Sequence, residues 1–215
     1  MIYAENILIC IAVPLLLSLL FTRDGARRFV AAFLTGMLMC LLAAYISGFI
    51  SLAAALGDHE TAIFISPIVE ELMKLLPILF MLFLLLPEDG ELLPVAVGVG
   101  AGFATFENCC HILASGAENL SYVLIRGMAV GVMHLVSMLG VTLALMLARR
   151  YRVLHLASVA GAMALSVTFH ALYNLLVSEP GLPSYVGYAL PLLTAAALMI
   201  PFRRLLRSAA DRDAG

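Results

Sequence analysis

The sequence predicts an all-α polytopic membrane protein, a bundle of about seven transmembrane helices. Of the 215 residues, 63% are hydrophobic and 12% are charged, and the mean hydropathy is +1.07. These values lie far outside the range of soluble globular domains. Because a membrane-spanning helix needs about 20 apolar residues, about seven such helices with short loops use most of the chain. We therefore expect one integral-membrane domain over residues 1–215, with no separate soluble domain.

Polar or charged segments separate seven apolar runs that are long enough to cross a bilayer. The separating segments are residues 22–28, 57–60, 87–91, 115–120, 149–152 and 178–184. The expected spans are residues 3–21, 29–56, 61–86, 92–114, 121–148, 153–177 and 185–201. The first span begins without the positively charged segment of a cleaved signal peptide, so we expect it to remain in the mature protein.

Ten of the twelve Lys and Arg residues lie in three clusters, after the first, fifth and seventh spans. With seven spans, all three clusters fall on one side of the membrane. The positive-inside rule makes that side cytoplasmic, so we expect the N-terminus outside and the C-terminus in the cytoplasm. The clustered residues are Arg23, Arg27, Arg28, Arg149, Arg150, Arg152, Arg203, Arg204, Arg207 and Arg212. The net charge of −2 says little about partners, and no feature indicates binding to nucleic acid.

Two adjacent carboxylates, Glu70 and Glu71, interrupt the third expected span. An ionisable side chain at the centre of a bilayer costs about 3 kcal/mol, so such residues face a bundle interior or a water-filled cavity and serve a function. Lys74 follows at helical spacing and can reach either carboxylate. It can keep one of them ionised while the other carries a proton, which suits general acid/base catalysis. The alternative is a structural ion pair, although this would not explain the second acid.

Further polar residues occur in the next three spans. The fourth span contains Glu107, the fifth contains His134, and the sixth has Ser166, His170 and Asn174 on one helix face. A rise of 1.5 Å per residue places the acids and histidines roughly 10 to 20 Å below the outer ends of their spans. We therefore expect them to line one cavity in the outer half of the bilayer.

His111 and two glycine pairs lie close to these residues in the sequence. His111 follows Glu107 by one turn, and it either pairs with Glu107 or lies at the membrane interface. The glycine pairs are Gly98 with Gly102, and Gly127 with Gly131, each four residues apart. This spacing lets helix backbones approach closely in membranes. We expect the second pair to bring His134 into the bundle.

Carboxylates and imidazoles activate water, either as general bases or by holding a metal ion, so hydrolysis inside the membrane is the leading interpretation. Intramembrane Glu, Lys and His also form proton relays, which leaves a proton- or ion-coupled transporter as the alternative. The sequence shows no internal repeat and no paired broken helices of the transporter kind. A non-catalytic membrane scaffold is the third alternative. We expect the four cysteines to be packing residues, because their spacing favours neither a disulfide nor a thiolate metal site. They are Cys10, Cys40, Cys109 and Cys110.

Four sequence blocks together resemble the PrsW family of intramembrane proteases, within the wider superfamily of CAAX proteases and bacteriocin-processing enzymes. The blocks are residues 66–74 (SPIVEELMK), residues 102–108 (GFATFEN), His134 and residues 170–174 (HALYN). They span residues 66–174 and occur in family order on four successive expected spans. The chain departs from the family pattern at His111, where an aromatic residue is expected, and at Asn174, where some relatives have Asp.

The resemblance implies cleavage of a peptide bond by water activated at the glutamate pair, Glu70 and Glu71. Glu107 then belongs to the same site, His134 and His170 bind a metal or stabilise the transition state, and Asn174 helps polarise the scissile carbonyl. If the enzyme depends on a metal, the implied ion is zinc, which takes about three protein ligands from His134, His170 and either Glu70 or Glu107. The metal-free alternative needs an ionised glutamate and donors aimed at the oxyanion.

The resemblance also implies where the enzyme acts and on what. Relatives of this type are associated with site-1 cleavage of membrane-anchored anti-sigma factors, so the implied partner is a membrane-anchored protein that enters laterally between the helices. The implied location is the bacterial cytoplasmic membrane.

Overall fold

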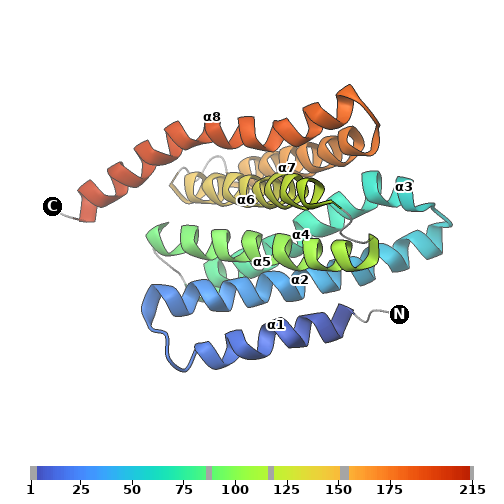
Figure 1. Ribbon diagram of the computed structural model, residues 1–215. Helices are drawn as coiled ribbons and strands as arrows, with labels where there is room; N and C mark the ends of the chain where they lie inside the picture. The colour runs from blue at the N-terminus through green and yellow to red at the C-terminus, as the bar shows by residue number, and fades with distance from the viewer. Residues whose placement is uncertain (1–3, 86–88, 116–118, 151–154, 214–215) are drawn as a thin grey trace.

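The computed structural model describes residues 4–85, 89–115, 119–150 and 155–213, and it is helical in almost all of them, with no strand in these ranges (Figure 1). This confirms the predicted all-α class. The α-helices are α1 (Ala4–Ser18), α2 (Asp24–Ala54), α3 (Asp58–Glu60), α4 (Ser66–Phe80), α5 (Asp89–Ser115), α6 (Leu120–Arg150), α7 (His155–Ser178) and α8 (Leu182–Asp213). Two π-helical segments, η1 (Thr61–Ile65) and η2 (Met81–Leu85), precede and follow α4.

Five helices within the described residues are long and apolar enough to cross a membrane. Their spanning parts are Asp24–Ala54, Glu91–Ala114, Leu120–Arg149, Ala157–Ser178 and Leu182–Met199. The first expected span is the apolar helix α1, which has only 15 residues. The third is divided among η1, α4 and η2, because π-helical turns interrupt the regular helix at both ends of α4. Of the expected boundaries and charges, residues 3, 86, 152 and 153 lie outside the described ranges.

Helix α4 occupies the centre of the bundle, where it contacts α2, α5, α6 and α7. The most extensive helix contact is between α2 and α5, and α5, α6, α7 and α8 then pack each on the next. Figure 1 shows α1 and α8 on opposite sides of the bundle. The ionisable residues on α4 are therefore enclosed by four helices.

Glycines on α5 allow its close approach to two neighbouring helices. A Cβ on Gly98 or Gly102 would collide with the α2 backbone at Phe29 or Phe33, which confirms the prediction for this pair. The prediction for Gly127 and Gly131 is wrong, because no atom lies within 4 Å of where their Cβ atoms would be.

Another glycine of α5 makes the contact that was expected of Gly131. A Cβ on Gly100 would lie 3.2 Å from the carbonyl oxygen of His134. The small residue that admits His134 is therefore on the partner helix α5, not on α6 itself.

Candidate active site

The carboxylate of Glu71 is the most extensively bonded group in the centre of the bundle. Its side chain is 2% exposed. Oε1 lies 2.6 Å from Lys74 Nζ and 2.8 Å from His170 Nδ1. The hydroxyls of Ser137 and Ser166 donate to Oε2 over 3.0 and 2.8 Å. A carboxylate offers about four acceptor positions, and four donors occupy them here, so Glu71 has no free lone pair with which to take a proton from water.

Lys74 joins the helix α4 to α6 and is completely buried. Its ammonium donates to Glu71 Oε1, approaches His134 Nδ1 to 2.9 Å and donates to Ser137 Oγ over 3.1 Å. An ammonium has three protons, and each has an acceptor here. The predicted pairing of Lys74 with the acids is therefore made with Glu71, in a network that leaves no donor of Lys74 for a ligand.

Glu107 on α5 links two cationic or polar groups of α6. Its Oε2 lies 2.5 Å from His134 Nε2, and its Oε1 lies 3.4 Å from Arg126 Nη2. The Glu107 side chain is 28% exposed, whereas that of His134 is completely buried. Because His134 Nδ1 accepts from the Lys74 ammonium, the neutral imidazole carries its proton on Nε2 and donates it to Glu107.

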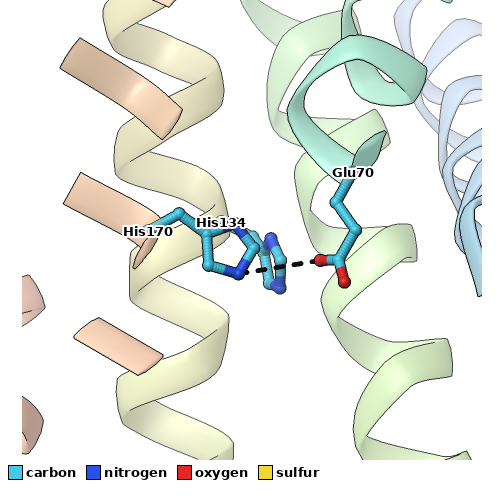
Figure 2. A group of neighbouring side chains, drawn as sticks. All are labelled: Glu70, His134 and His170. Carbon is cyan, nitrogen blue, oxygen red and sulfur yellow. Dashed lines mark ion pairs between the residues drawn. The ribbon is translucent and has the colours of Figure 1, made fainter. Parts of the chain in front are cut away.

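Glu70 differs from Glu71 in having an unused acceptor. Its Oε2 is buried without a hydrogen-bond partner among the described residues. The nearest cationic or polar group recorded is His170 Nε2, at 3.7 Å, and Figure 2 shows this imidazole and that of His134 directed toward the Glu70 carboxylate. His170 donates Nδ1–H to Glu71, so its Nε2 presents a lone pair to the same space.

Glu70, His134 and His170 form a set that can hold a divalent metal ion. One ligand atom from each lies within 4.8 Å of the others, and two imidazoles with one carboxylate are a zinc-type donor set. The contact of His170 Nδ1 with Glu71 is the carboxylate–histidine arrangement that orients metal-binding imidazoles. The unpartnered Glu70 oxygen also fits a ligand. His134 would bind a metal through Nε2 as the Nδ1–H tautomer, which would replace its present contacts with Glu107 and with the Lys74 ammonium.

The π-helical turn before α4 depends on Asn174. In a π-helix the carbonyl of residue i accepts from the N–H of residue i+5, and Pro67, five residues after Ala62, has no N–H. The Asn174 side chain on α7 donates to the Ala62 carbonyl over 2.9 Å instead. Asn174 therefore anchors η1, and its recorded contact is with backbone, apart from the other five predicted site residues.

The structure brings together Glu70, Glu71, Glu107, His134 and His170, as the matched depths predicted. The recorded partner of His111 is the Tyr122 hydroxyl, 3.1 Å from its Nε2. Our sequence reasoning missed Arg126 and Ser137. Arg126 was recognisable as the one arginine outside the three charge clusters, on the face of His134 two turns earlier. All four cysteines are free; Cys40 is buried, Cys109 and Cys110 are half-buried and Cys10 is exposed.

Comparison with known proteins gives one family. The sequence model described as PrsW family intramembrane metalloprotease matches residues 25–202, which is most of the chain. No curated protein and no solved structure matches significantly.

Proposed function

Because the chain belongs to the PrsW family of intramembrane metalloproteases, we propose that it hydrolyses peptide bonds of membrane-anchored proteins with water activated at Glu70. The observation that carries this choice is the contrast between the two adjacent acids. Four groups donate hydrogen bonds to Glu71, whereas Glu70 keeps a buried oxygen beside His170 that has no hydrogen-bond partner among the residues the structure describes. A general base needs a free lone pair within reach of the attacking water.

In this mechanism Glu70 takes the proton of the attacking water and later delivers it to the leaving amine. Glu71 holds the His170 ring through Nδ1, so that Nε2 faces the reacting atoms. In the metal-free route, the Nε2–H of His134, which Glu107 now accepts, would donate to the developing oxyanion. In the alternative, metal-dependent route, a divalent ion, zinc by its donor set, would be held by Glu70, His134 and His170; it would polarise the scissile carbonyl and acidify bound water in place of the base role of Glu70.

We also propose the complete topology: seven crossings, with the N-terminus outside and the C-terminus in the cytoplasm. The segments α1 and Asp58–Leu85 then cross the bilayer as a short and an irregular span. Figure 1 supports an odd number of crossings, because the start of α1 and the end of α8 lie at opposite ends of the bundle. The turn between α1 and α2 and the ends of α6 and α8, where the arginine clusters occur, lie at one end.

For the substrate we propose a membrane-anchored anti-sigma factor, cut at the first site of its processing in the bacterial cytoplasmic membrane. The support for this class is the sequence resemblance of the four blocks. The substrate segment would enter laterally and reach the site from its outer side, where the Glu107 side chain is 28% exposed.

The test is a cleavage assay in liposomes with a panel of single-pass anti-sigma factors, for the wild type and for Glu70→Gln. General-base assistance is typically worth ~10² to 10⁴-fold, so Glu70→Gln should lose that much turnover while folding normally. Metal analysis and chelator treatment of the same preparation separate the metal-dependent and metal-free routes. Near wild-type cleavage by Glu70→Gln would reject the proposed base.

A further inference from the structure

We propose that Arg126 and the Tyr173 hydroxyl bind the backbone carbonyls of an unwound substrate segment next to the cleaved bond. This proposal rests on the protease function above. It assigns a peptide-backbone subsite to two side chains that the reaction itself does not use.

Arg126 is a membrane-embedded cation with donors to spare. Within the described residues its recorded contact is with Glu107, at 3.4 Å, which is long for a charge-assisted hydrogen bond. Its Nε is buried and has no hydrogen-bond partner in residues 4–85, 89–115, 119–150 and 155–213. Lys74, in contrast, donates all three protons to protein groups. Arg126 is therefore the cation that can still bind a ligand.

Tyr173 provides a second unused donor on the neighbouring helix α7. Its side chain is 2% exposed and belongs to a buried cluster with Ala129, Val130 and Met133 of α6, the first two of which lie one turn along α6 from Arg126. Its hydroxyl is buried without a hydrogen-bond partner among the described residues. Tyr173 follows His170 by one turn of α7, and Arg126 precedes His134 by two turns of the antiparallel helix α6, so both donors lie on the same side of the proposed reacting groups.

The distance to the reacting groups fits a neighbouring residue of the substrate. Glu107 connects Arg126 Nη2 to His134 Nε2 through contacts of 3.4 and 2.5 Å. With the width of one carboxylate, the two nitrogens are at most about 8 Å apart, which is roughly two residues of extended chain. Arg126 is thus within reach of a backbone carbonyl one or two residues from the scissile bond.

The ligand class follows from charge and from the bilayer. Glu107 already balances the charge of Arg126, and a second buried carboxylate would carry a large desolvation penalty. A backbone carbonyl adds no charge. A substrate helix must unwind before its peptide bond can be attacked, and backbone groups without partners are strongly unfavourable in lipid. Donors for these released carbonyls therefore favour the unwound state.

Two variants and one control test this subsite, with cleavage in liposomes and binding of the same transmembrane peptide to the Glu70→Gln protein. Hydrogen bonds with a charged donor predict a loss of about 10- to 150-fold in kcat/KM for Arg126→Gln, and neutral ones about 2- to 12-fold for Tyr173→Phe. Peptide binding should weaken in parallel, with a smaller change in kcat than in KM. Arg28→Gln removes another Arg–Glu pair, that with Glu91, and should leave both readouts unchanged.

Substrates with an ester in place of an amide, one or two residues from the cleaved bond, identify the contact. The ester carbonyl is a poorer acceptor, so it should slow the wild type and have little further effect on Arg126→Gln. If Arg126→Gln does not fold, Tyr173→Phe alone tests the subsite, because removal of a buried hydroxyl that has no partner does not destabilise the fold. Wild-type cleavage and peptide binding by Tyr173→Phe overturn the subsite. The proposal is also overturned if cleavage is insensitive to the ester but depends on an acidic side chain of the substrate. A wild type that binds peptides but cuts none contradicts the protease function instead.

Discussion

The adjacent acids of α4 lie in two regions of opposite character. Around Glu71, every donor of Lys74 and every acceptor position of the carboxylate is engaged by protein groups. Within the part of the chain that the structure describes, an acceptor of Glu70 and donors of Arg126 and Tyr173 are instead buried without hydrogen-bond partners. A network in which every hydrogen-bonding group has a partner stabilises one arrangement of the fold. Buried polar groups without partners lower the stability of the fold unless a ligand binds them. Proximity in sequence therefore says little about which acid reacts.

The largest expected effect in the completed region is that of Lys74→Met. It removes the cation and leaves the Glu71 charge buried, which typically costs about 3 to 5 kcal/mol. We expect a corresponding loss of stability in SDS unfolding followed by circular dichroism, and a low yield of folded protein.

The double variant Glu71→Gln with Lys74→Met leaves no buried charge and should recover most of that stability. Arg28→Met is the matched control, since it breaks an ion pair with Glu91 whose side chains are 50% and 35% exposed. Exposed pairs contribute about 0 to 1 kcal/mol. Equal losses for Lys74→Met and Arg28→Met would show that the Glu71 network does not stabilise the fold.

The Asn174 side chain, like those around Glu71, has a protein partner, the Ala62 carbonyl. Its sequence motif had instead suggested a role at the scissile carbonyl. Asn174→Leu keeps the size but leaves the Ala62 carbonyl without its donor, which should cost about 1 to 3 kcal/mol. Hydrogen exchange should increase at η1, and turnover should fall because η1 leads into the helix that carries Glu70.

Asn174→Asp separates the two roles, because an ionised aspartate cannot donate to Ala62. It should behave like Asn174→Leu at η1. If η1 keeps its normal protection from hydrogen exchange in both variants but cleavage is lost, Asn174 acts on the scissile carbonyl and not on η1.

The sequence predicted which side chains would lie together, because ionisable residues in an apolar chain face the bundle interior. Glu70, Glu71, Glu107, His134 and His170 meet, as expected from their positions in the spans. The difference in hydrogen bonding between the two acids was not predictable, because it depends on Lys74 of α4 and Ser137 of α6, which both donate to Glu71. Helical periodicity does not show which of two neighbouring residues faces them.

Two features of the fold, the contact of α5 with α6 and the π-helical segments beside α4, could not be predicted from sequence patterns. The α5–α6 approach at His134 uses Gly100, a single glycine, so the four-residue spacing pointed to the wrong helix. The third expected span contains two π-helical segments, which hydropathy does not detect. Pro67 was visible in the sequence, but Asn174, which donates to the Ala62 carbonyl that Pro67 leaves free, is 112 residues from Ala62, and only the packing of α7 against η1 brings them together.

The smallest effect concerns a single donor to Glu71. Ser166→Ala removes one of the four, a neutral hydrogen bond worth about 1 kcal/mol. The other three donors remain, so His170 should keep its orientation and turnover should change less than about threefold, in contrast to Glu70→Gln.

Thr168→Ala is the matched control on the same helix, because its hydroxyl donates to the Ala164 carbonyl at an exposed position. It should be neutral in both SDS unfolding and cleavage. If Ser166→Ala instead lost as much turnover as Glu70→Gln while remaining folded, the Glu71 carboxylate would be part of the chemistry. The distinction between a completed structural region and an incomplete reactive one would then fail, because a single missing donor would have changed the reaction without changing the fold.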